Sequence, residues 1–290
     1  MAPSSAPSPV LRSVPCLAPH GGFHRVAYAE WPGPPGAPTL VCVHGLTRNG
    51  RDFDPLARAL SERYRVICPD VAGRGRSDWL AVPGDYGYPL YLADMAALLA
   101  RLDVESVDWV GTSMGGLIGM MLAAQPGNPI RRLVLNDVGP FLPKAALERI
   151  GSYVGKDPHF PDIAALEEYL RRIHAPFGPL TAEQWRHLAE HGWRHLPDGS
   201  GVGLAYDPHI GDAFQGEMKD VDLWPMWDAM RCPTLVIRGA ESDLLRAEDA
   251  AAMTQRGPRA TLAEFPGIGH APALMAADQI AAVRDFLAAS

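Results

Sequence analysis

The chain has 290 residues, of which 47% are hydrophobic and 20% are charged, and its formal net charge is −7. This composition is typical of an ordinary globular protein that buries a large core. A net negative charge without a local block of Lys or Arg argues against a nucleic-acid partner, because phosphates need a basic surface.

The N-terminal segment predicts neither export nor membrane insertion. Residues 1–9 lack the basic start and long apolar run of a signal peptide, and no stretch of the chain is apolar enough to span a membrane. We therefore expect a cytoplasmic protein without a membrane partner. Residues 1–19 are rich in proline and show little periodicity, so we expect a loose lead-in. The four cysteines have no C-x-x-C spacing and are expected to behave as small buried hydrophobic residues.

Strands and helices then alternate. Residues 24–30 predict an edge strand, followed by a proline-rich turn. Continuous apolar runs predict strands covered on both faces, and amphipathic runs predict the helices between them. The predicted strands are 39–44 and 64–68, and the predicted helices are 54–63 and 91–102.

The next strand ends at a serine between glycines. The apolar run 107–110 stops at Gly111-Thr-Ser113-Met-Gly115, and residues 117–124 read as a helix. A side chain at either glycine would collide where strand and helix pass closely, so Ser113 is predicted on a sharp, strained turn with its hydroxyl exposed. The amide of Met114 then lies at a helix start, where unpaired N–H groups favour negative charge.

The alternation breaks once and then returns. Residues 131–136 predict a strand, but residues 141–230 contain helical stretches at about 144–153, 162–174 and 182–191 without a convincing buried strand. We interpret 141–230 as an inserted helical cap. Strands at 232–238 and 260–265 and helices at 246–255 and 276–288 follow. Residues 20–140 and 231–290 therefore predict one α/β core with a mostly parallel sheet and helices on both faces.

The G-x-S-x-G turn in this setting resembles the α/β-hydrolase family. The resemblance implies a Ser–Asp–His triad in that chain order. His270 is the candidate base because it follows the last strand on a loop that Gly267 and Gly269 allow to bend. Asp243, on the loop after the preceding strand, is the candidate acid. Asp137 also ends a strand in the acid-bearing region of this fold and remains the alternative.

The residues around the turn suggest further roles. An oxyanion needs two donors, which we expect from the backbone N–H groups of Met114 and of Leu46, in a loop that resembles the family's His-Gly oxyanion loop. Arg48 and His44 are possible substrate-binding residues: Arg48 for a carboxylate, with a solvated arginine as the alternative, and His44 with a structural role as the alternative. His187, His191 and His195 have helical spacing, but Gly192 interrupts the helix, so we predict no metal and no cofactor.

A serine nucleophile implies an acyl-enzyme, so the leading hypothesis is a cap-gated serine carboxylesterase acting on a small-molecule ester. Small to medium acyl substrates would fit, including hydroxyalkanoate oligomers and lactones. Two alternatives stay open: a carbon–carbon bond hydrolase of ring meta-cleavage products, which uses a similar triad, and a non-catalytic small-ligand receptor of the same fold. The sequence does not fix the oligomeric state.

Overall fold

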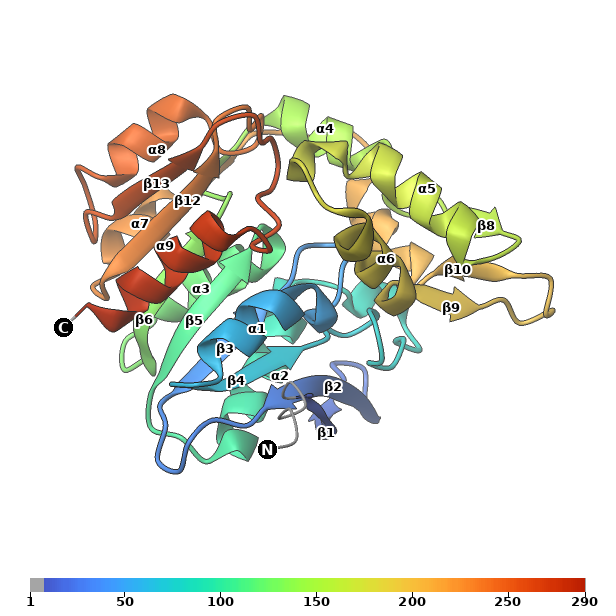
Figure 1. Ribbon diagram of the computed structural model, residues 1–290, viewed down its shortest axis with the longest axis horizontal. Helices are drawn as coiled ribbons and strands as arrows, with labels where there is room; N and C mark the ends of the chain where they lie inside the picture. The colour runs from blue at the N-terminus through green and yellow to red at the C-terminus, as the bar shows by residue number, and fades with distance from the viewer. Residues whose placement is uncertain (1–7, 290) are drawn as a thin grey trace, which may run out of the picture.

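The computed structural model describes residues 8–289 and has an eight-stranded sheet at its centre (Figure 1). The strand order is β1-β2-β4-β3-β5-β6-β12-β13. The sheet is parallel from β4 to β13 and antiparallel at the β1-β2-β4 edge. The mostly parallel sheet predicted from the sequence is therefore confirmed. The bounds are β1 Val10–Leu17, β2 Phe23–Trp31, β3 Thr39–Val43, β4 Arg65–Pro69, β5 Val107–Thr112, β6 Ile130–Asn136, β12 Thr234–Gly239 and β13 Thr261–Phe265.

Helices cover both faces of the sheet because the strands present buried side chains on both sides. The helices of this layer are α1 Asp54–Leu60, α2 Tyr88–Leu102, α3 Met114–Ala123, α7 Trp224–Ala229, α8 Ala247–Met253 and α9 Ala277–Ala288. One buried cluster joins α2, α3 and α8 to the sheet, and a second joins α1 and α9 to the other face. None of the helices within residues 8–289 is long and apolar enough to cross a membrane.

Residues 141–230 mostly form a separate layer over the carboxyl ends of the strands, on the right of Figure 1. Its helices are α4 Lys144–Gly151, α5 Ile163–Ile173 and α6 Ala182–His191, close to the predicted positions. The layer also contains short strands that the sequence did not predict, β8 His159–Phe160, β9 Trp193–His195 and β10 Val202–Leu204, while β7 Phe141–Leu142 pairs with β11 Val221–Asp222. Helix α7 lies within 141–230 but packs against α3 of the sheet-covering layer.

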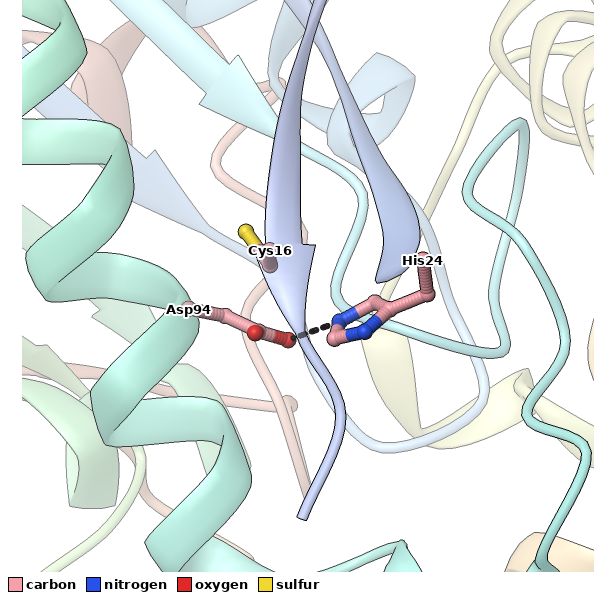
Figure 2. Close-up of side chains that lie close together, drawn as sticks. All are labelled: Cys16, His24 and Asp94. Atoms are coloured by element: carbon pink, nitrogen blue, oxygen red, sulfur yellow. Dashed lines mark hydrogen bonds and ion pairs between the residues drawn. The ribbon is translucent and has the colours of Figure 1, made fainter. Parts of the chain in front are cut away.

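The N-terminal segment corrects one expectation. Val10–Leu17, predicted as part of a loose lead-in, forms edge strand β1, while residues 1–7 of that lead-in lie outside the described residues. A buried polar cluster ties the β1-β2 hairpin to α2: His24 donates to Asp94 across 2.9 Å, and Cys16 lies opposite His24 in the strand register (Figure 2). Burial raises the pKa of Cys16 to about 12, so it remains a thiol.

Candidate active site

Ser113 lies at the turn between β5 and α3, as the glycine spacing predicts. Its φ of 52° and ψ of −115° lie outside the regions that ordinary residues favour. A Cβ on Gly111 would approach the carbonyl oxygen of Gly115 to 2.2 Å, and one on Gly115 would approach that of Val43 to 2.0 Å. Only glycine permits this close passage, and the result is a serine hydroxyl held at the carboxyl end of the central strand.

A hydrogen-bonded chain begins at this hydroxyl. His270, on the loop after β13, lies with its Nε2 3.0 Å from the Oγ of Ser113, where it accepts the hydroxyl proton. Its Nδ1–H donates to Oδ2 of Asp137 across 2.8 Å. Asp137 is fully buried and also accepts from the amide of Gly239 and the hydroxyl of Ser242. The structure thus brings together a serine hydroxyl, an imidazole and a buried carboxylate, the three groups that a catalytic triad requires.

Asp243, the first candidate for the acid, does not contact His270. Its side chain is 47% exposed and forms an ion pair with Arg149 of α4, in which one of the two hydrogen bonds spans 2.9 Å. The physical reason lies one residue earlier, because Ser242 points inward and bonds the Asp137 carboxylate. Its neighbour in the loop then faces outward. The orienting carboxylate beside His270 is therefore Asp137, which the sequence offered as the alternative.

Two backbone amides that follow strands β3 and β5 are unpaired within the described part of the chain. Within residues 8–289, the N–H groups of Leu46 and Met114 donate to no protein acceptor. Arg74, which is fully buried, holds the loop of the first amide by donating to the carbonyl of Leu46 across 2.9 Å. Its guanidinium also donates to the hydroxyl of Tyr91 across 2.9 Å and contacts the sulfur of Met114. Sequence analysis missed Arg74, because a buried arginine in a Gly-rich loop resembles a solvated one.

The Ser113 end of this hydrogen-bonded series lies in a pocket between the sheet and the layer of residues 141–230. Ser113 and His270 line its floor, and Arg149, Tyr153 and His174 line its wall from the 141–230 segment. Much of the remaining lining is apolar, including Leu46, Phe53, Ile150, Ile173, Phe177, Leu188 and Met275. An apolar cleft with a few convergent polar groups is the usual form of a small-molecule site.

Comparison with known proteins agrees with this geometry. A family model described as the alpha/beta hydrolase fold matches residues 38–275. The chain belongs to the α/β-hydrolase family. It is 48% identical over 287 residues to the 3-hydroxybutyrate-oligomer hydrolase of Cupriavidus necator, covering 96% of this chain and 98% of that protein. An α/β hydrolase of Novosphingobium aromaticivorans superposes with a TM-score of 0.86 at 36% identity, covering 97% of this chain and 98% of that one.

A more distant relative has another hydrolytic activity. The 2-(acetamidomethylene)succinate hydrolase of Mesorhizobium japonicum is 29% identical over 236 residues, which cover 80% of this chain and 81% of that protein. The predicted family and fold class are confirmed, and the chain is a hydrolase.

His44 has a structural role in this hydrolase. It is buried, its Nδ1–H donates to the carbonyl of Gly45 across 2.7 Å, and its Nε2 accepts from the amide of Val71 across 2.9 Å. Both ring nitrogens are therefore occupied, so His44 is not free to bind a substrate. Its bonds tie the loop that carries the Leu46 amide to the end of β4.

The same bonds predict a pH dependence of stability. Burial lowers the pKa of His44 from 6.5 to about 4, so its contribution to stability is complete above pH 6.5 and is lost as the pH falls toward 4. We expect wild type to lose about 3 kcal/mol of unfolding free energy relative to His44→Asn over this range. Urea unfolding of both proteins measures this difference, since other titrating groups cancel between them. Parallel pH curves would contradict the assignment.

Arg48 lies in the pocket wall but does not present a free charge. Its Nε and Nη2 donate to the two carboxylate oxygens of Asp52, each across 2.8 Å, and Nη2 also lies 3.4 Å from the carbonyl of Leu188. Only 6% of the residue is exposed. The bidentate pair neutralises the guanidinium locally, which weakens the prediction that Arg48 binds a substrate carboxylate.

Of the three histidines weighed as metal ligands, His187 and His191 lie beside Asp54, with one ligand atom of each within 4.8 Å of the others, and His195 is not in this group. His187 donates to the carbonyl of Arg51 across 2.8 Å and stacks on His191. His195 lies on β9 and contacts the edge of Trp193. Asp54, near His187, is paired with Arg51.

Proposed function

We propose that this hydrolase cleaves the ester bonds of short 3-hydroxybutyrate oligomers with Ser113 as the nucleophile. The observation that carries the proposal is the hydrogen-bonded chain from Ser113 through His270 to Asp137 at the floor of the pocket. The printed name of the relative at 48% identity supplies the substrate class, and the alignment spans nearly the whole of both chains.

In the acylation step, the oxygen of Ser113 attacks the ester carbonyl carbon while its proton moves to Nε2 of His270. Asp137 holds the imidazole in the orientation and tautomer that leave Nε2 free to accept this proton, and it stabilises the imidazolium that forms. The carbonyl oxygen becomes an oxyanion, which the amides of Leu46 and Met114 bind. The tetrahedral intermediate collapses, and His270 protonates the departing 3-hydroxyl oxygen of the next unit.

Water completes the reaction. The released oligomer end leaves the pocket, and a water molecule attacks the acyl group on Ser113 while His270 takes its proton. Collapse of the second intermediate returns the proton to Ser113 and frees 3-hydroxybutyrate. Each cycle therefore consumes one water molecule and one ester bond, with no cofactor in any step.

In this proposal residues 141–230 act as a cap over the α/β core of residues 20–140 and 231–290. The cap contributes the wall of the pocket through α4, α5 and α6, so a substrate must enter between the two layers. A short chain can enter such a pocket, whereas the surface of an insoluble polymer cannot. This distinction favours oligomers over granules as substrates.

The proposal is tested with the linear trimer of 3-hydroxybutyrate. We expect the purified protein to convert the trimer to monomer, which chromatography measures. We expect it to release much less monomer from polymer granules that contain the same number of ester bonds. Ser113→Ala serves as the control for contaminating esterases. Trimer that remains intact at high enzyme concentration would contradict the proposed substrate.

A further inference from the structure

His174 is a polar residue of the pocket that the mechanism above does not use. It follows the last residue of α5 and is 7% exposed. Its ring stacks on Phe177 with a centroid distance of 4.5 Å and an interplanar angle of 18°. It lines the same pocket as Ser113 and His270, and its ring nitrogens form no hydrogen bond with any residue from 8 to 289. A buried histidine without a protein partner, facing a substrate pocket, is available to a ligand.

The surroundings keep this imidazole neutral. Burial lowers the pKa of His174 well below its usual value, and the nearby charges of Arg48 and His270 lower it further. A neutral imidazole presents one N–H donor and one nitrogen acceptor. Arg48 beside it is already neutralised by Asp52. This part of the wall therefore offers hydrogen bonds without net charge, which suits a hydroxyl group better than a carboxylate.

We propose that His174 binds the 3-hydroxyl of the acyl unit attached to Ser113 and thereby makes this hydrolase selective for 3-hydroxyacyl esters. The inference rests on the proposed function, since it names a recognition contact within the same site. A hydroxyl both donates and accepts, so one neutral imidazole pairs with it. The 3-hydroxyl is also close to the reacting carbon, being separated from it by two carbon atoms, and His174 lines the same pocket as His270 and Ser113.

The geometry assigns a second task to Phe177. Because its ring stacks face to face with that of His174, Phe177 restricts the rotation of the imidazole and so fixes the directions of the two ring nitrogens. A ring held in one orientation discriminates by hydrogen bonding, and a substrate without the hydroxyl leaves the ring nitrogen that would bond it without a substrate partner. His174 is thus a specificity residue, while the chemistry stays with Ser113 and His270.

The test compares two substrates that differ by one hydroxyl, ethyl 3-hydroxybutyrate and ethyl butyrate. Wild type should have a kcat/KM at least about 10-fold higher for the hydroxy ester, from the cost of leaving a buried polar group unpaired. His174→Phe keeps a ring to stack on Phe177 but removes both nitrogens, and it should bring this ratio to about 1. His174→Gln restores a donor and an acceptor and should recover part of the preference. His195→Phe, in β9 and outside the pocket lining, is the matched control and should leave both rates unchanged.

Four outcomes of this comparison decide between a specificity role and a structural role for His174. Equal rates for the two esters in wild type would overturn the inference, as would a His174→Phe variant that loses both activities while the ratio persists, because that loss would indicate a purely structural role. Failure of wild type to hydrolyse either ester would overturn the proposed function, and the inference with it. A ratio that falls in His174→Phe and recovers in His174→Gln would support the assignment.

Discussion

Replacing Ser113 with alanine should lower kcat for ester hydrolysis by about 10⁶-fold, because the variant has no oxygen to form the acyl-enzyme. His270 and the two unpaired amides remain in place, so KM should change little. The measurement is single-turnover and steady-state hydrolysis of the 3-hydroxybutyrate trimer at enzyme concentrations that allow slow rates to be detected. Thermal unfolding of the variant controls for the strained φ of 52° at this position.

Residual activity in the Ser113→Ala variant would contradict the role of this hydroxyl. If Ser113→Ala retained more than a few per cent of the wild-type rate, the reaction would not pass through this hydroxyl. Direct attack of water activated by His270 would then have to be considered, since the imidazole would still be oriented by Asp137.

Asp137→Asn should lower kcat by about 10⁴-fold, whereas Asp243→Asn should change it by less than about 10-fold. An amide at position 137 can donate to Nδ1 of His270, and this stabilises the tautomer whose Nε2 carries a proton and cannot accept one from Ser113. The Asp243 side chain is half-exposed and bonds Arg149 instead, so its replacement leaves the imidazole oriented. The two variants carry the same chemical change and form a matched pair.

The stability of both variants needs to be measured beside the rates. Asp137 is fully buried and also accepts from Gly239 and Ser242, so its replacement disturbs three hydrogen bonds. Rates are compared at a temperature where both proteins remain folded. A larger loss in Asp243→Asn than in Asp137→Asn would show that the acid works from the later loop.

The sequence predicts the positions of Ser113 and His270 well because each depends on local constraints. Gly111 and Gly115 are required by the close passage of β5 and α3, and these contacts lie within a few residues of Ser113. His270 follows the last strand of a parallel sheet, and the carboxyl ends of such strands meet at one edge. Their distance of 3.0 Å in the structure agrees with this expectation.

Sequence analysis placed Asp243 ahead of its alternative, Asp137, whereas in the structure Asp137 contacts His270, because this choice depends on distant contacts. Asp137 and Asp243 both follow strands, and the choice is decided by whether Ser242 or Asp243 points inward in a loop. The partners that fix this choice are more than 90 residues from each aspartate along the chain: Gly239 and Ser242 for Asp137, and Arg149 for Asp243. No periodic pattern reports such pairings.

Strand β1 was not predicted because its sequence carries little of the pattern of a strand. Only Val14 and Cys16 of its eight residues are buried, and Pro15 lies within it. Proline is tolerated in an edge strand because the missing N–H faces away from the sheet. The short strands within 141–230 have two or three residues each, too few for an alternating pattern. The place of His174 in the pocket was not predicted either, since a lone histidine after a helix gives no indication of the pocket that it lines.

The central claim is that Ser113 becomes covalently acylated, and mass spectrometry of the enzyme during turnover tests it most directly. Rapid acid quenching of the reaction with 3-hydroxybutyrate trimer, followed by peptide mapping, should show an added hydroxybutyryl mass on the peptide that contains Ser113. The same peptide should stay unmodified in Ser113→Ala. Trimer hydrolysis at the wild-type rate with the acyl group on another residue would contradict the account.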